Sequence, residues 1–236
     1  MNENPLVLDE VQLRYPTDGV GNLSLALEQG TALVVVGRNG VGKSTLLKTV
    51  AGLIDPAAGR VLLSGTNVLH LPPSQRAHYL SFVASTPPRG TVMTVRDVIE
   101  LALEAGGNEA HSAAVDEALT TGGISDWSDL LLDHLSDGMA QRVMLVRAFV
   151  QARDIVLMDE PTAFLDVVGR KATMEQIGEW MGRGKTVVLS THDLEAVEAA
   201  GWANRWLLLR PPSEGGSTVM EESFSSAVAR RMLMGK

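Results

Sequence analysis

Short apolar runs separated by turn residues occupy much of the chain, and they predict a core built on β-strands. Residues 23–27 alternate Leu with Ser or Ala, the period-two pattern of a strand with one buried face. Residues 32–36 are continuously apolar and rich in Val, which is typical of a parallel strand buried on both faces. Further strands are predicted at residues 6–8, 11–13, 60–64, 80–84, 155–158 and 186–190.

Helical spacing of apolar residues alternates with these runs. Glycine pairs and single glycines separate the helical stretches from one another. Residues 211–217 are predicted to form a loop, and the tail from Met220 onward a short helix. The other helices are predicted at residues 45–51, 95–103 and 111–119, with a further one opening at 135–141 and a short one at 72–76.

This order of elements predicts a single α/β domain over residues 1–236. Its core lobe is expected over about residues 1–86 and 149–236, and a helical insert over about residues 87–148 interrupts it. No internal repeat is visible in the sequence.

A glycine-rich segment, Gly37–Ser44, separates the apolar strand at 32–36 from the helix at 45–51. Its residues fit the pattern G-x-x-x-x-G-K-[ST], in the strand–loop–helix context that the pattern requires. Glycines let backbone N–H groups curl around phosphate oxygens, and the helix N-terminus adds partial positive charge there. Lys43 can reach the β- and γ-phosphates and Ser44 can hold Mg²⁺. The segment therefore predicts a nucleoside triphosphate site.

Two carboxylates, Asp159 and Glu160, end the apolar run at 155–158. Asp159 is well placed to hold Mg²⁺ through a water, and Glu160 points to a different side, where it can orient or deprotonate an attacking water. Taken alone, the pair is equally compatible with a solvated turn. Downstream of a phosphate-binding loop, the catalytic interpretation is favoured.

The helix that opens at 135–141 begins with a cap. Ser136 is expected to be its N-cap, and an apolar face runs on through Phe149. The pattern is compatible with an ordinary capped core helix. A Ser and a Gly at a helix start also form an anion site, so both interpretations stay open at this point.

Composition narrows the function classes. The formal net charge is −8 and the sequence pI is about 5.1, which argues against a general nucleic-acid binder. The chain has no Cys, so disulfides and thiolate metal sites are excluded, and its five His residues are scattered without ligand spacing. There is no apolar run of the length that spans a membrane, and no export signal opens the sequence, so a cytoplasmic protein is expected.

Taken together, these motifs resemble the ATP-binding subunit of ABC transporters over nearly the whole chain. Tyr15 lies where that family places an aromatic side chain that stacks on adenine, although a half-buried strand residue is the alternative. The matching motifs are Gly37–Ser44 for Walker A, Leu135–Gln141 for the signature sequence, Ile155–Glu160 for Walker B, Ala163–Asp166 for the D-loop, and Ser190–Asp193 for the switch histidine.

The resemblance implies a P-loop NTPase fold of ABC type: an N-terminal antiparallel β subdomain, a mixed or parallel core sheet, and a helical insert. It implies two copies facing head to tail around two ATP molecules with Mg²⁺. In this arrangement Glu160 orients the water, His192 contacts the γ-phosphate and Asp166 reaches across the dimer. The resemblance places ATP between Gly37, Asn39, Gly40, Gly42, Lys43, Ser44 and Thr45 of one copy and Ser136 and Gly138 of the other.

The same resemblance implies partners. A transmembrane permease would contact the helical insert, a solute-binding protein would act indirectly, and the subunit would lie on the cytoplasmic face of the membrane. No nucleic acid is expected. Residues 135–138 and 159–166 look most like importers of iron-siderophore, heme or cobalamin type. The alternatives are a soluble non-transport ABC ATPase, serving DNA repair, translation or iron–sulfur assembly, or an exporter subunit.

Three departures from the family pattern stand out. Where the family has a Gln after the strand at 80–84, this chain has Ser85 and Thr86, and either hydroxyl could contact Mg²⁺ or water with less reach than an amide. Asp137 replaces a Gly, and because its carboxylate would repel a γ-phosphate, it is expected to point away. Met139 and Ala140 replace a more polar pair, which we interpret as a change in helix packing.

Overall fold

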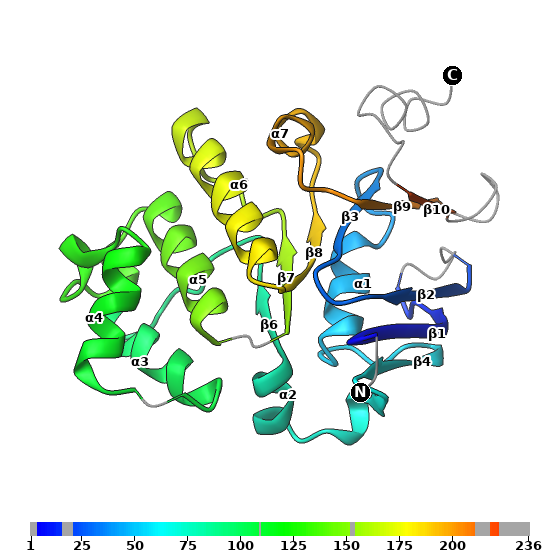
Figure 1. Cartoon of the computed structure of the whole chain (residues 1–236), viewed down its shortest axis with the longest axis horizontal. Helices are drawn as coiled ribbons and strands as arrows, with labels where there is room; N and C mark the ends of the chain where they lie inside the picture. The colour runs from blue at the N-terminus through cyan, green and yellow to red at the C-terminus, as the bar shows by residue number, and fades with distance from the viewer. Residues whose placement is uncertain (1–3, 16–20, 109, 152–153, 211–217, 222–236) are drawn as a thin grey trace.

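Two β-sheets form the framework of the molecule (Figure 1). The computed structural model describes residues 4–15, 21–108, 110–151, 154–210 and 218–221. The first sheet has four antiparallel strands in the order β2-β1-β4-β5. These strands are β1 (Leu6–Gln12), β2 (Leu23–Leu27), β4 (Ala58–Leu63) and β5 (Thr66–Asn67).

The second sheet has six strands in the order β10-β9-β3-β8-β7-β6. All neighbours in it run parallel except β10, which pairs antiparallel to β9. An antiparallel sheet next to a mostly parallel core sheet confirms the predicted fold class. The strands are β3 (Ala32–Gly37), β6 (Leu80–Val83), β7 (Ile155–Asp159), β8 (Thr186–Ser190), β9 (Arg205–Leu209) and β10 (Thr218–Glu221).

Helices cover the core sheet and form the insert. α1 (Lys43–Val50) lies between the two sheets, while α3, α4 and α5 pack together around a cluster of their own. The remaining helices are α2 (Pro73–Tyr79), α3 (Val95–Ala105), α4 (Ser112–Thr121), α5 (Asp137–Gln151), α6 (Val167–Gly182) and α7 (Leu194–Ala200). Short 3₁₀ turns occur at Val68–His70, Ser125–Trp127 and Leu132–His134.

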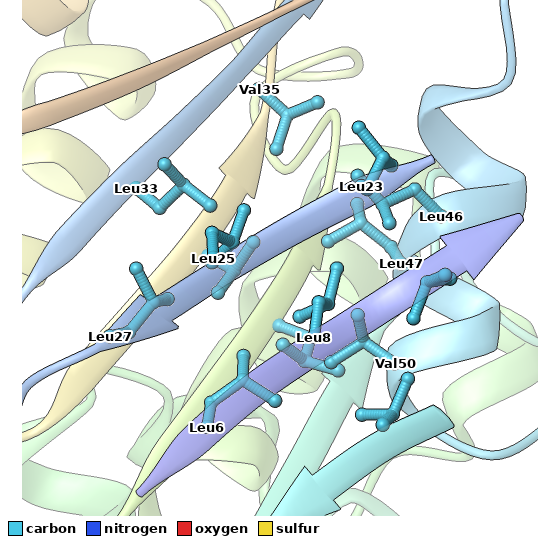
Figure 2. Close-up of a cluster of buried hydrophobic side chains, with 14 of the residues drawn as sticks. Leu6, Leu8, Leu23, Leu25, Leu27, Leu33, Val35, Leu46, Leu47 and Val50 are labelled. Atoms are coloured by element: carbon cyan, nitrogen blue, oxygen red, sulfur yellow. The ribbon is translucent and has the colours of Figure 1, made fainter. Parts of the chain in front are cut away.

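A buried leucine and valine cluster fixes α1 in place. Figure 2 shows side chains of β1, β2, β3 and α1 meeting in this cluster, among them Leu25, Leu33 and Leu47. On the other side of β3, Val34 and Val36 pack into a second cluster with residues of α5, α6 and α7. Both faces of β3 are therefore buried, as the apolar run at 32–36 predicted, and the loop that follows β3 starts from a rigid base.

Several elements differ from the sequence-based expectations. The strands predicted at 6–8 and 11–13 are one strand, β1, with a bulge at Glu10, whose φ is +48°. The helix expected from Met220 is wrong at its start, because 218–221 form β10. Residues 211–217 and 222–236 lie outside the described part. The expected insert boundary at 148 falls inside α5, which continues to Gln151.

Among the longer elements, α6, α7 and β9 had no sequence-based prediction. The sequence of α6 opens with two exposed valines and buries only scattered positions such as Met174 and Ile177, so its periodicity is weak. No helix in the described residues combines the length and apolar character needed to cross a membrane.

Candidate functional site

The predicted phosphate-binding loop joins β3 to α1 at the carboxyl edge of the core sheet. Gly40 has φ +79° and Gly42 has φ +113°, a region in which a side chain is strained. A Cβ added at Gly40 would meet no atom within 4 Å, so backbone conformation and not space requires glycine there. Gly42 is also the N-cap of α1 and provides no side-chain cap, so the first turn of this helix offers its N–H groups to an anion.

Lys43 lies over this loop. It is buried, with 8% of its surface exposed, and its Nζ donates hydrogen bonds to the carbonyl oxygens of Gly37 at 2.9 Å and Arg38 at 3.4 Å. The ammonium group therefore lies beside the first two residues of the loop, where a phosphate oxygen could replace a carbonyl oxygen as its hydrogen-bond partner. Asn39 and Ser44 are exposed and Thr45 is partly exposed.

Asp159 ends β7 beside β8. The two strands pair in register there, and the Oγ of Ser190 donates a 2.6 Å hydrogen bond to Oδ1 of Asp159, which is 2% exposed. The backbone N–H of Glu160 donates to the carbonyl oxygen of Ser190 at 3.0 Å and to its Oγ at 3.2 Å. Ser190 therefore orients both carboxylate residues. Ser190 belongs to the Ser190–Asp193 motif, but this role of its hydroxyl was not predicted, because it depends on the pairing of β7 with β8.

Glu160 and His192 form a pair. Nδ1 of His192 lies 2.8 Å from Oε2 of Glu160, and the backbone N–H of His192 donates to the same oxygen at 3.3 Å. The side chain of Glu160 is 19% exposed and that of His192 is 73% exposed. Glu160 also has φ +48°, a strained conformation for a residue with a side chain, which is common at functional sites. The structure brings together the two side chains assigned to the attacking water and the γ-phosphate.

The proposed Mg²⁺ ligands are hard oxygen donors. Within the described residues, no three His, Cys, Asp or Glu side chains form a metal-binding group. Mg²⁺ is usually held by one or two carboxylates together with phosphate oxygens and water, so Asp159 and the Ser44 hydroxyl suit it without such a group. Ser85, partly exposed, follows β6, the strand next to β7. The described donors fit a magnesium nucleotide, and its binding stays a prediction.

The start of α5 agrees with the predicted cap. The Oγ of Ser136 accepts a hydrogen bond from the backbone N–H of Met139 at 3.3 Å. A Cβ added at Gly138 would lie 3.0 Å from the carbonyl oxygen of Phe164, and Asp166 caps α6 by accepting from Gly169 N at 2.7 Å. The signature-like and D-loop-like segments are therefore neighbours in one chain.

The two halves of the expected ATP site are apart within one copy. In Figure 1, α1 lies on one side of β6 and β7 and α5 on the other. Tyr15 has 58% of its surface exposed, which leaves its ring accessible for stacking, although no contact of the structure tests that role. Asp137 forms an ion pair with Arg89, a residue that the sequence did not single out.

Comparison with known proteins places these features in a family. The sequence model described as ABC transporter matches residues 20–163. A cobalt import ATP-binding protein of Rhodobacter capsulatus is 38% identical over 88% of this chain and 73% of its own length. A thiamine import ATP-binding protein of Vibrio parahaemolyticus is 35% identical over 82% and 83%, respectively.

Two further matches extend the comparison. An energy-coupling factor transporter ATP-binding protein of Methanospirillum hungatei is 32% identical over 94% of this chain, which spans 57% of that relative's length. A dimeric ATP-binding cassette solved in a post-hydrolysis state with ADP and Pi superposes with a TM-score of 0.78 at 25% identity, covering 87% of this chain and 94% of that one. Other relatives are named for the import of cobalamin or taurine, and one for a manganese transport system.

Proposed function

We propose that this chain, which belongs to the ABC transporter family, is an ATP-hydrolysing subunit that powers import. In this proposal the Gly37–Ser44 loop binds the triphosphate, Glu160 orients the attacking water and His192 contacts the γ-phosphate. The observation that carries this assignment is the 2.8 Å Glu160–His192 pair, which lies at the same sheet edge as a glycine loop that leads into an uncapped helix. Phosphoryl transfer to water depends mainly on positioning and on charge stabilisation, which these groups supply.

The protonation pattern follows from the pair. A carboxylate only accepts hydrogen bonds, so Nδ1 of His192 carries a proton when it contacts Glu160. The second oxygen of Glu160 is then left to accept from a water. A contact from Nε2 of His192 to a phosphate oxygen would require a proton on that nitrogen also.

Charge on the triphosphate is balanced by this chain from two directions. Lys43 and the N–H groups at the start of α1 donate to phosphate oxygens, in exchange for the carbonyl contacts of Lys43. Ser44 and Asp159 would hold Mg²⁺, which when bound neutralises phosphate charge, and Ser190 keeps the Asp159 carboxylate oriented. Ser85 or Thr86 stands in this arrangement where the family has a Gln.

A second copy of the chain would complete each site. The separation of α1 and α5 in one copy supports this arrangement, and so does the dimeric cassette among the similar structures. Ser136 and Gly138 of one copy would close over the ATP held by the other, and Asp166 would cross the interface. Tyr15 would stack on adenine.

The helical insert supplies the surface for a permease. A cavity of about 430 Å³ opens there, lined mainly by apolar side chains such as Val98 and Leu101, and Leu101 is 54% exposed. Arg147 also lines it. Burial lowers the pKa of Arg147 to about 10, so the guanidinium remains charged at neutral pH. An apolar permease segment that carries an acidic residue fits this cavity, and the subunit would lie on the cytoplasmic face of the membrane.

The solute is chosen by the permease and a solute-binding protein. Residues 135–138 and 159–166 favour an iron-siderophore, heme or cobalamin importer, and a relative named for cobalamin import agrees with this. Relatives named for cobalt, thiamine and taurine import, and one named for manganese transport, widen the range of solutes. Co-purification with a multi-span membrane protein would support the importer, whereas salt-sensitive binding to nucleic acid would favour a non-transport ATPase.

The direct test uses ATP hydrolysis by the purified protein. The wild-type chain should release phosphate in a reaction that requires Mg²⁺, and Glu160→Gln should bind ATP with unchanged affinity while it releases almost none. A Glu160→Gln protein that turned over like wild type would remove Glu160 from the proposed role. Glu175→Gln on the exposed face of α6 is the matched control and should hydrolyse ATP normally.

A further inference from the structure

The strand β6 and the residues after it are fastened to α5 by side-chain hydrogen bonds. The Oγ of Ser81 donates to the carbonyl oxygen of Ala148 at 2.8 Å. In the opposite direction, Arg147 donates to the carbonyl oxygen of Phe82 at 2.6 Å, and Nε2 of Gln141 donates to that of Ala84 at 3.2 Å. β6 belongs to the core sheet and α5 to the insert, so these bonds join the two parts of the molecule.

Arg89 adds the last connection at the start of α5. One of its guanidinium nitrogens donates to the carbonyl oxygen of Leu135 at 2.9 Å and, at 3.4 Å, to those of Leu132 and Asp133. The other nitrogen forms the ion pair with Asp137. Next to it, the backbone N–H of Gly90 donates to the Asp133 carboxylate at 2.8 Å.

A single guanidinium therefore holds the whole turn that leads into α5. The carbonyl oxygens at 132, 133 and 135 belong to a 3₁₀ turn and its end. That of Leu132 also accepts from the Leu135 N–H at 3.3 Å, so Arg89 adds to the bonding of the turn itself. The planar fork of Arg suits several such acceptors at once, whereas a Lys ammonium presents a point charge. Ser136 and Gly138 lie directly after this turn, so their position depends on Arg89.

The charge of Asp137 is the second reason to assign a role to Arg89. An acid in the first turn suits the helix dipole, but the proposed function brings a γ-phosphate of the opposing copy towards this same turn. In an open molecule the ion pair is partly exposed, with side-chain exposures of 36% and 54%, and such pairs contribute little. Closure would remove water from the turn, and an unpaired carboxylate facing phosphate would then oppose it.

We propose that Arg89 is a positioning residue for ATP-driven closure of the dimer, because it neutralises Asp137 and holds Ser136–Gly138 against the segment that follows β6. This role rests on the proposed function. It also gives residues 84–90, where the family's Gln is missing, a direct mechanical connection to the signature-like segment. A shift of that segment would move the start of α5 with it.

The test measures ATP-dependent dimerisation in the Glu160→Gln background, where ATP is bound but not consumed. Sedimentation velocity gives the dimer dissociation constant, and a fluorescent ATP analogue gives the affinity of the monomer for nucleotide. Arg89→Ala should raise the dimer dissociation constant about tenfold or more, because it leaves like charges facing each other across the interface. Nucleotide affinity of the monomer should stay unchanged, because Lys43 and the glycine loop are untouched.

Two further variants separate the effect of the Arg89 charge from the effect of its forked guanidinium group. Asp137→Gly added to Arg89→Ala should recover part of the lost dimerisation, because no carboxylate then needs a partner, and the remaining deficit relative to Asp137→Gly alone measures the lost carbonyl contacts. Arg89→Lys should fall between the parent and Arg89→Ala, because it keeps the charge and loses the fork. If Arg89→Ala does not fold by circular dichroism, the Lys variant and the Asp137→Gly pair of variants carry the test.

A matched control exists in the same insert. Arg96 and Asp116 join α3 to α4 with side-chain exposures of 37% and 56%, nearly those of the Arg89 pair. Arg96→Ala should leave the dimer dissociation constant unchanged. If Arg89→Ala dimerises as well as the parent protein, or if adding Asp137→Gly restores none of the lost dimerisation, the role of Arg89 is overturned and the proposed function still stands. A parent protein that never dimerises with ATP would overturn the two-copy site itself, and this role with it.

Discussion

The starts of α1 and α5 are the two helix ends assigned to one ATP molecule, and they are built in opposite ways. At the start of α1, Gly42 takes the place of a capping side chain, and the next residue is a buried cation, Lys43. The start of α5 is exposed, is capped by Ser136, and carries an acid, Asp137. α1 is therefore ready for an anion in a single chain.

The difference lies in what fixes each end. Packing of Leu46 and Leu47 against both sheets holds α1, and core packing changes little between states. Polar contacts from Arg89 and Ser136 hold the start of α5, and such contacts exchange with water more readily. This contrast supports the proposal of a permanent phosphate site at α1 and an adjustable lid at α5 that would close over the nucleotide of a second copy.

Removing the carboxylate assigned to the attacking water, while both helix starts stay intact, should have the largest effect on ATP hydrolysis. Glu160→Gln is expected to lower the rate of phosphate release by about 10²–10⁴, the range that general base catalysis contributes. ATP-dependent dimerisation should persist, because neither α1 nor α5 changes. Single-turnover kinetics separates the chemical step from binding, and a defect in binding instead of turnover would contradict this division.

Lys43→Ala removes the cation at the start of α1 and tests the role of that helix end in ATP binding. Loss of a charge-assisted hydrogen bond of about 1.5–3 kcal/mol should weaken ATP binding to the monomer about 10- to 100-fold. Isothermal titration in the Glu160→Gln background checks this. Lys48→Ala, an exposed lysine later in the same helix, is the control and should bind ATP as the parent does. Unchanged affinity in Lys43→Ala would remove this lysine from the site.

Gly138→Ala disturbs the packing at the start of α5 without changing its charge. Its Cβ would lie 3.0 Å from the carbonyl oxygen of Phe164, so either the start of α5 or the D-loop-like segment must shift. We expect roughly tenfold slower ATP hydrolysis at saturating ATP, since displacements of this kind around a closed site affect the rate strongly. Monomer affinity for ATP should be unaltered. Gly182→Ala at the end of α6, where a Cβ meets nothing within 4 Å, is the control.

Ser136→Ala should have a smaller effect on the same side. The loss of an N-cap costs about 1 kcal/mol of folding stability, which thermal unfolding can measure. Hydrolysis should fall further than this stability loss explains, because the same hydroxyl is assigned to the partner's phosphate. A variant that is less stable yet hydrolyses ATP at the wild-type rate would assign Ser136 to capping alone.

The sequence predicted the α1 half far better than the α5 half. The buried strand, the glycine loop and the helix lie within 21 consecutive residues, 32–52, so local patterns were sufficient. Arg89 meets Asp137 across 48 residues of sequence, and only the folded chain brings them together. Ser190 acts on Asp159 through strand pairing, which no local pattern encodes. The second half of β10, from Met220, was mistaken for the start of a helix because a four-residue strand carries too little periodicity to decide.

Ser85→Gln sharpens the comparison at its most subtle point, the segment that connects the two halves. Ser85 follows β6 at the sheet edge that holds Asp159, while Gln141 and Arg89 fasten its neighbours to α5. If the hydroxyl serves where an amide serves in relatives, Ser85→Gln should leave basal hydrolysis within about threefold of wild type, because Lys43 and Glu160 carry most of the charge stabilisation.

The stimulation of hydrolysis by a permease should change more in Ser85→Gln, since the longer side chain alters the segment between the insert and the site. Hydrolysis is therefore measured with and without permease in lipid discs, and Thr86→Gln, at the other candidate position, is measured alongside. Equal stimulation in Ser85→Gln, Thr86→Gln and wild type would mean that neither hydroxyl acts in coupling, and that the Arg89 connection to α5 carries the signal without them.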